Sequence, residues 1–145
     1  MCTFCQILAG ELPGIFVHRG QTCAAFMDIQ PINPGHVLIV PTHHVAHLGK
    51  LDASSVGELM QVGQHIAAAL RGSELRCEGV NLFLADGEAA GQEVPHVHLH
   101  VFPRFTGDGF GLRFGPSYAQ LPPREALDAA AAQIRAALDN VGDAV

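Results

Sequence analysis

Polar and hydrophobic residues alternate strictly in the sequence HVHLHVF, where single Val and Leu residues separate His96, His98 and His100. Alternate side chains of a β-strand share one face, so this period of two predicts a strand with three imidazoles on one face. One histidine in a strand is usually structural, but three in alternation give up much of a face that would otherwise pack in a core. The pattern therefore predicts a functional surface on this strand.

Four further segments have the composition and boundaries of strands. Residues 15–19 and 22–28 predict a hairpin around a Gly-Gln turn. The β-branched run 36–41 follows the turn sequence PINPG and is typical of a central strand, and residues 79–85 predict another strand.

Apolar residues recur at helical spacing in residues 51–72 and 123–141. Asp52 suits the N-cap of the first helix, and Pro123 suits the first turn of the second. A short helix is expected over residues 3–9, ending at a glycine. Two glycines cost the first long helix about 1 kcal/mol each relative to alanine, so tertiary packing must hold it.

These elements predict an α+β fold, a mostly antiparallel meander sheet with two main helices packed on it, in a single domain over residues 1–145. Hydrophobic residues make up 48 % of the chain and charged residues 15 %, which indicates a globular protein. The apolar runs are shorter than the roughly 18 residues that a membrane span needs. The first residues lack the basic region of a signal peptide, so a cytoplasmic location without membrane partners is expected.

The formal net charge is −6, and Lys50 is the only lysine. Binding to a nucleic-acid backbone needs a basic stripe, so nucleic acid is excluded as a partner. A small anionic ligand remains compatible with this charge, because backbone amides can hold a phosphate. The loop before the histidine strand contains GEAAGQ, and its amides around Gly91 and Gln92 suit a phosphate oxyanion.

The three histidines allow a catalytic metal site, a nucleophilic imidazole or a site that only binds. No carboxylate follows the strand closely enough to complete a familiar catalytic metal set. The neighbouring loop favours phosphate chemistry among the three.

Four cysteines in a reducing compartment do not indicate a disulfide framework. Cys2 and Cys5 form a C-x-x-C pair, whereas Cys23 and Cys77 are expected to pack as small hydrophobic residues. A redox dithiol of thioredoxin type would follow a strand, but this pair begins the chain. Zinc is therefore favoured over a redox function, with further ligands supplied from elsewhere.

The sequence HVHLHVF resembles the His-φ-His-φ-His-φ-φ signature of the histidine triad (HIT) superfamily of nucleotide hydrolases and transferases. Four segments (FCQILAGELPG, AFMDIQPINPGHVLIVPTHHV, GEAAGQEVPHVHLHVFPR and GDGFG) resemble the family in order and spacing. The resemblance implies an enzyme that cleaves a bond to the α-phosphate of a purine nucleotide through a nucleotidyl-histidine intermediate. Nucleoside phosphoramidates and dinucleoside polyphosphates are the candidate substrates. It also implies a homodimer formed through the sheets. The alternative is a nucleotide-binding or scaffold module with little turnover.

The same resemblance assigns the site residues. It makes His98 the nucleophile, His100 a contact to the phosphate oxygens and His36 a fourth histidine that orders the site. It makes Asp28 the ribose ligand, and its implied base pocket consists of Phe4, Ile7, Phe26 and Ile29.

A subset of the family carries a structural zinc, and the matching positions here are Cys2, Cys5, His44 and His96. This Cys₂His₂ set suits a closed tetrahedral site. His43, beside His44, is the rival third ligand.

Two departures from the family concern substrate choice. Ala85 and Asp86 stand before the loop glycine where many members have amide-bearing residues, and Ala85 cannot donate a side-chain hydrogen bond to phosphate. Glu93 places a negative charge near the expected leaving group.

Overall fold

The computed structural model describes residues 2–141 and divides into two compact units, Met1–Gly109 and Phe110–Val145. The first unit contains the whole sheet and every residue assigned above to a site. The single domain expected over residues 1–145 stays a prediction.

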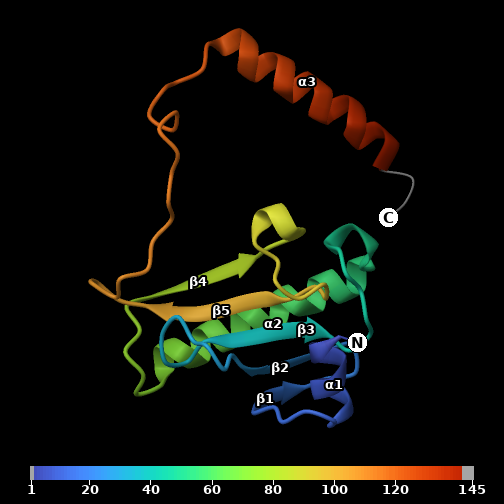
Figure 1. Cartoon of the computed structure of the whole chain (residues 1–145), viewed down its shortest axis with the longest axis vertical. Coiled ribbons are helices and arrows are strands. Elements are labelled where there is room, and N and C mark those ends of the chain that lie inside the picture. Colours follow the sequence, from blue (N-terminus) through green and yellow to red (C-terminus); the bar gives the residue numbers. More distant parts are fainter. Residues whose placement is uncertain (1, 142–145) are drawn as a thin grey trace. The chain divides into compact units, whose positions relative to one another are not determined.

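The first unit is built on a five-stranded antiparallel sheet (Figure 1). Its strands are β1 (Phe16–Arg19), β2 (Cys23–Met27), β3 (Val37–Pro41), β4 (Gly79–Leu84) and β5 (Leu99–Arg104). The order β1-β2-β3-β5-β4 joins a three-stranded meander to a β4–β5 hairpin, whose second strand pairs with β3. The α+β class and the antiparallel sheet are confirmed.

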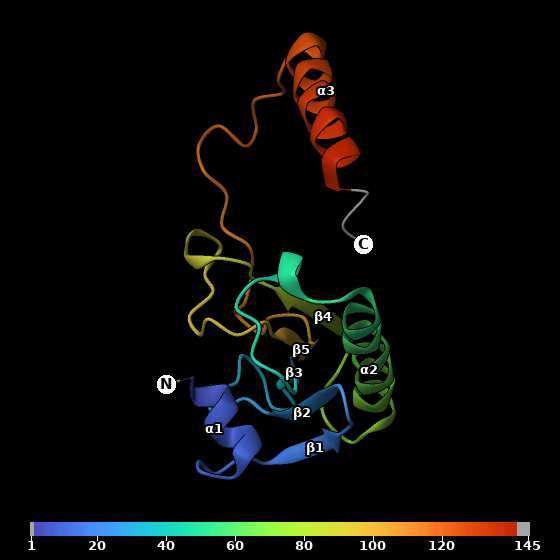
Figure 2. The same ribbon diagram turned by 90° about the vertical axis from the view of Figure 1, so that its right-hand side faces the viewer.

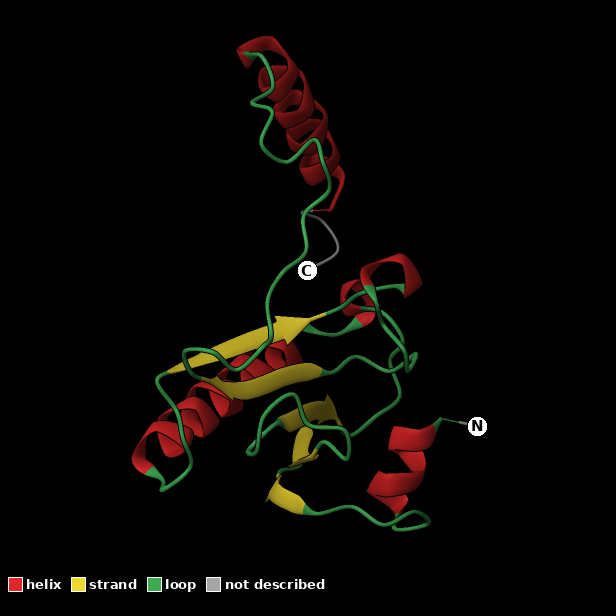
Figure 3. Ribbon diagram, turned by 60° about the vertical axis from the view of Figure 1, so that its left-hand side comes forward, coloured by secondary structure: helices red, strands yellow, loops and turns green. Residues whose placement is uncertain are grey.

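The histidine segment enters the sheet later than the alternation predicts. The regular ladder of β5 begins at Leu99, so His96 and His98 precede it. The amide of Val97 donates instead to the carbonyl of Val45, 2.7 Å away, in the irregular chain that follows β3. Figure 3 shows that irregular chain also connects β3 to α2 and β4 to β5. Short 3-10 turns, Leu48–Lys50 and Glu88–Ala90, interrupt these two connections.

Two helices lie on opposite sides of the sheet, α1 (Thr3–Ala9) and α2 (Ala53–Gly72) (Figure 2). The α2 N-terminus is capped as predicted, because the Asp52 carboxylate accepts a hydrogen bond from the amide of Ser55 at 2.9 Å. Gly63 allows α2 to approach the sheet, since a Cβ at this position would lie 3.1 Å from Leu99 Cδ2. Gly63 thus lowers the helix propensity of α2 but allows its close packing on the sheet.

The alternation of β3 and β5 separates two cores. The side chains facing α2 include Ile39, Leu99 and Val101, which are fully or almost fully buried. The side chains facing α1 form a second core of Phe4, Phe26, Leu38 and Val40. His98 and His100 lie on the α1 side, because they alternate with Leu99 and Val101.

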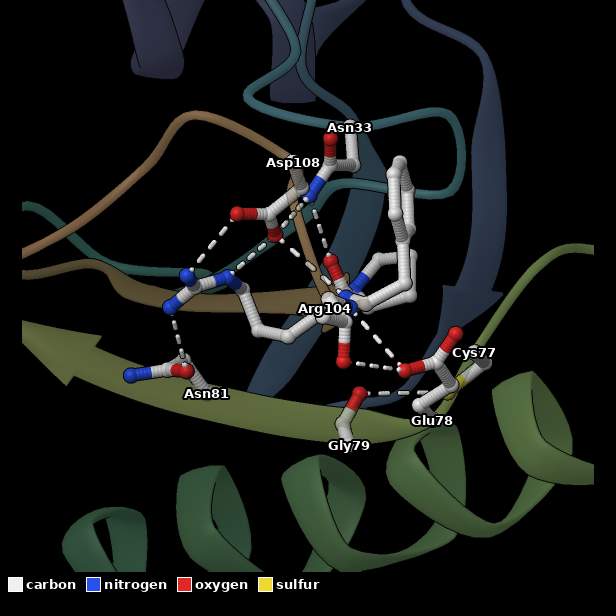
Figure 4. A network of polar contacts seen from close by, with 10 residues as sticks. Asn33, Cys77, Glu78, Gly79, Asn81, Arg104 and Asp108 are labelled. Carbon is white, nitrogen blue, oxygen red and sulfur yellow. Dashed lines mark hydrogen bonds and ion pairs between the residues drawn. The ribbon is translucent and has the colours of Figure 1, made fainter.

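A polar network fixes the end of β5 (Figure 4). Arg104 pairs with Asp108 through two nitrogens, at 2.5 and 3.0 Å, and with the Asn81 side chain of β4 at 3.0 Å. Asn33, in the turn before β3, donates to Asp108 and to the carbonyl of Pro103, each at 2.9 Å. Asp108 thus joins the turn before β3 to β5, and Arg104 extends the network to β4.

We expect Asp108→Ala to lower the free energy of unfolding by about 3 kcal/mol, because the partly buried Arg104 guanidinium loses its carboxylate partner and the buried Asn33 amide loses one of its two acceptors. Asp128→Ala is the matched control. Asp128 pairs with Arg124 at the same i,i+4 spacing but is exposed, so its loss costs at most about 1 kcal/mol. Urea denaturation of both variants measures the difference, and equal losses would contradict the importance assigned to the network.

The second unit contains α3 (Arg124–Val141), which confirms the helix expected over residues 123–141. Before it, the rings of Phe114 and Tyr118 stack with centroids 3.9 Å apart. Among the helices of residues 2–141, none combines the length and apolar character needed to cross a membrane.

Candidate functional site

The three alternating histidines form the centre of a buried imidazole group. His96 and His98 are buried, and His100 is partly exposed. The ring centroid of His98 lies 4.8 Å from that of His100 and 5.2 Å from that of Phe4 in α1. These two neighbouring rings, one imidazole and one phenyl, therefore hold the middle histidine in one orientation.

The backbone determines which nitrogen of His98 carries the proton. Its Nδ1 lies 2.7 Å from the carbonyl oxygen of His96, which can only accept a hydrogen bond. Nδ1 is therefore protonated in the neutral ring, and Nε2 carries the lone pair. An imidazole that attacks through Nε2 requires this tautomer.

His36 and His100 form a hydrogen-bonded pair whose direction is also fixed by the backbone. The amide of Ile32 donates to His36 Nδ1 at 3.1 Å, so His36 Nε2 carries the proton. This Nε2 lies 2.9 Å from His100 Nδ1, to which it donates. The neutral His100 ring then carries its own proton on Nε2. Neighbouring rings thus present a lone pair at His98 Nε2 and an N–H at His100 Nε2.

Burial keeps the His36 and His100 rings neutral. It lowers the pKa of His100 from 6.5 to about 4, with further lowering by the nearby His98 and His36. Burial also lowers the pKa of His36, although Asp28, 3.6 Å from its Nδ1, acts in the opposite direction. The Ile32 amide is closer to Nδ1 and can only donate, so we assign the neutral tautomer.

We expect the free energy of unfolding to fall as the pH drops from about 6.5 toward 4. The unfolded His100 binds a proton near its ordinary pKa of 6.5, but the folded ring does so only near 4. The unfolded state therefore binds more protons in this window, and stability rises with pH through it, by at most about 3 kcal/mol. Urea denaturation at a series of pH values measures the slope. His100→Gln should make the slope shallower, and an unchanged slope in this variant would contradict the assignment.

The residues expected around the nucleoside are brought together in part. Phe4, Ile7 and Phe26 pack in one apolar cluster beside His98, with the Phe4 and Phe26 centroids 5.6 Å apart. Ile29 is 94 % exposed and lies outside this cluster, so its place in a base pocket stays a prediction. Asp28 follows β2 and accepts a hydrogen bond from the amide of Gln30 through Oδ1, at 2.8 Å.

The loop expected to hold phosphate is fastened by its own side chains. Gln92 donates to the carbonyl of Ala46 and accepts from the amide of Gly87, both at 2.8 Å. Gly91 has φ of +89°, a conformation that glycine adopts without strain. The Gln92 side chain thus holds the loop shape, and substrate contacts by Gly91 and Gln92 stay predictions. Asp86 accepts from the amide of Leu48 at 3.2 Å, which ties the loop to the chain after β3.

The four residues expected to bind zinc lie together. Their ligand atoms, from Cys2, Cys5, His44 and His96, are all within 4.8 Å of one another. The sulfur-to-Nδ1 separations are 3.4 Å for Cys2–His96, 3.7 Å for Cys5–His96 and 3.5 Å for Cys5–His44. In a tetrahedral zinc site, bonds of about 2.3 Å to sulfur and 2.0–2.1 Å to nitrogen separate these ligand types by roughly 3.6 Å. The geometry of these residues therefore fits zinc, and the third ligand atom in the group belongs to His44 rather than to His43.

His96 is oriented for this site by the chain itself. Its Nε2 lies 3.0 Å from the carbonyl of Pro41, so Nε2 is protonated and Nδ1 presents a lone pair to the two sulfurs. The sequence carries no sign of this carbonyl or of the amide of Ile32, because a backbone group leaves no residue signature.

Known proteins match this chain in sequence and in fold. The sequence profile of the HIT domain matches residues 9–107. Adenosine 5'-monophosphoramidase of Candida albicans is 35 % identical over 116 residues, covering 76 % of each chain. A solved HIT family protein from Bacillus anthracis has a TM-score of 0.84 at 32 % identity, covering 94 % of this chain and 96 % of that one. A zinc-bound histidine triad family protein from Mycobacterium smegmatis has a TM-score of 0.73 at 38 % identity with the same coverage.

An antiparallel sheet with three alternating imidazoles on one face defines the class of histidine triad proteins. The chain belongs to the HIT family, since both its sequence profile and its fold match. Family membership and the phosphoramidase relative support, at a general level, hydrolase activity on nucleotides.

Proposed function

We propose that the protein hydrolyses the bond between the α-phosphate of a purine nucleotide and its leaving group, in two displacements at phosphorus. The observation that carries the proposal is the pair of complementary nitrogens. His98 Nε2 has a lone pair for attack, and His100 Nε2 has a proton for a phosphate oxygen. The tautomer of His98 is fixed by the carbonyl of His96. The tautomer of His100 is fixed, through His36, by the amide of Ile32.

In the first displacement, His98 Nε2 forms a bond to the α-phosphorus and the bond to the leaving group breaks. In the second, water attacks the phosphorus, the bond between phosphorus and His98 Nε2 breaks and leaves its electron pair on the nitrogen, and the proton lost by the water goes to solvent. His100 donates to a non-bridging oxygen in both steps, where its N–H offsets the developing negative charge. Dividing one difficult displacement into two lowers the barrier of each.

The proposed nucleoside site consists of Asp28 for the ribose hydroxyls and the Phe4, Ile7, Phe26 and Ile29 side chains for a purine. A carboxylate can accept two hydroxyl hydrogen bonds, and Asp28 retains Oδ2 for this purpose. The phosphoramidase relative supports a nucleoside phosphoramidate as substrate, with dinucleoside polyphosphates as the second candidate. The exposed Glu93 disfavours an anionic leaving group, which favours the phosphoramidate.

The proposed metal site would hold zinc through Cys2, Cys5, His44 and His96. Four protein ligands leave no open position, so the chemistry such a zinc supplies is structural. We also propose that the protein is a homodimer joined through its sheets, as its resemblance to the family implies. Light scattering at micromolar concentration tests this assembly.

Incubation with adenosine 5'-phosphoramidate and with diadenosine polyphosphates, followed by chromatography of the products, tests the function. We expect AMP to be released, and to be released faster from the phosphoramidate. If AMP binds to the protein but none of these substrates is cleaved to AMP, the result would instead support a nucleotide-binding module with little turnover. Activity in a disulfide reductase assay that is lost in Cys5→Ser would support a redox dithiol.

A further inference from the structure

A second group of metal-ligating side chains lies on the opposite face of the sheet from the histidine triad. It combines His18 of β1, Cys23 of β2 and Glu58 of α2, whose ligand atoms are within 4.8 Å of one another. Cys23 is buried in the core that faces α2. The group is therefore separate from the proposed zinc site, which lies on the α1 side of the sheet.

We propose that His18, Cys23 and Glu58 bind a divalent cation of the zinc class. The set offers one sulfur, one imidazole nitrogen and one carboxylate oxygen, all of which bind zinc in proteins. The Cys23 Sγ to Glu58 Oε1 distance is 3.6 Å. Zinc bonds of about 2.3 Å to sulfur and 2.0–2.2 Å to oxygen give roughly the same separation around a tetrahedral ion.

The turn between β1 and β2 leaves room for the ion. Gly20 closes the turn by donating its amide to the carbonyl of Cys23 at 2.8 Å. A Cβ built on Gly20 would lie 3.0 Å from His18 Nε2 and 3.2 Å from Glu58 Oε1. The absence of a side chain at this position keeps the space between the nitrogen and the carboxylate open.

The carboxylate of Glu58 is already oriented toward the thiol. Its second oxygen accepts a hydrogen bond from the hydroxyl of Thr22, which leaves Oε1 for Cys23. Such an outer partner orients a ligating carboxylate and supports metal affinity.

Without a cation, the Cys23 thiol retains its proton. Burial, followed by the neighbouring Glu58, raises its pKa to about 11. On binding, the ion takes the position of this proton, which is released to solvent, and the sulfur becomes a thiolate ligand. Three protein ligands leave a fourth position for water. The ion would join β1 and β2 to α2, so its binding stabilises the fold by mass action.

Cobalt(II) is the probe for this site, because thiolate coordination gives it a charge-transfer absorption. Equilibrium dialysis of the full chain against Co²⁺ gives the number of ions bound per chain. We expect His18→Ala and Cys23→Ala each to lose one bound equivalent, or to bind it at least about 10-fold more weakly. Cys77→Ala is the matched control, since Cys77 is a partly buried thiol outside the group, and it should retain full binding.

The measurement separates this site from the first one. Cys5→Ser removes an equivalent of its own, so the losses in Cys5→Ser and His18→Ala should add in the double variant. His18 is exposed and its replacement leaves the core intact, which circular dichroism verifies. Unchanged Co²⁺ stoichiometry and affinity in both His18→Ala and Cys23→Ala would overturn the proposal.

Discussion

Replacing His98 by alanine is expected to reduce AMP release by at least about 1,000-fold, because the variant has no nitrogen to form the covalent intermediate. The contacts to base and ribose are made by other residues, so AMP should still bind. His98→Asn should be as inactive as His98→Ala. The turnover number and the AMP dissociation constant of each variant test this prediction.

His47→Ala is the matched control, since His47 is an exposed imidazole that lies 3.3 Å from the Asp86 carboxylate in the loop. It should retain near-normal turnover. Rapid quenching of the unmodified protein with labelled substrate should trap an acid-labile adduct that resists hydroxylamine, as expected of a phosphoramidate. Substantial turnover in His98→Asn would exclude His98 as the nucleophile.

Removing the proposed zinc ion is expected to lower the melting temperature by roughly 10 °C, with partial retention of activity at low temperature. An ion present at 1,000 times its dissociation constant stabilises the folded chain by about 4 kcal/mol, and a domain of this size loses 2–4 °C per kcal/mol. Turnover should fall only in part, because loss of the ion affects His98 only through increased mobility of the segment from His96 to His98. Chelation followed by differential scanning calorimetry and an activity assay measures both effects.

Cys5→Ser should reproduce the effect of chelation, whereas Cys77→Ala should not. The opposite outcome is complete and reversible loss of activity on chelation with an unchanged melting temperature. It would indicate a catalytic metal and would contradict a free, nucleophilic His98.

Much of the fold follows from periodicity. The apolar runs placed β2, β3 and β4 within one or two residues, and the helical spacing placed α2 and α3 equally well. The order of the sheet does not follow from such patterns. The place of β5 between β3 and β4 depends on long-range pairing, which a local pattern does not encode.

Some residues of the candidate site were likewise predictable from the sequence, and others were not. Residue types and their resemblance to a family selected the imidazoles and the Cys/His set, which the structure brings together. The group of His18, Cys23 and Glu58 left no signal, because Glu58 in α2 lies 35 positions after Cys23 and farther still from His18. Cys23 was expected to be only a small hydrophobic residue, and it does lie in the core.

The hydrogen bond from the Ile32 amide to His36 gives the imidazole pair a polarity. A chain of neutral rings can run in either direction, and the two directions differ in which end is a donor. Here one peptide N–H, in a turn between two prolines, decides that the donor end is His100 Nε2, two rings away. The turn thus permits only one direction of hydrogen bonding through the two rings. A proline at position 32 would remove that N–H and leave the direction undetermined, with every histidine still in place.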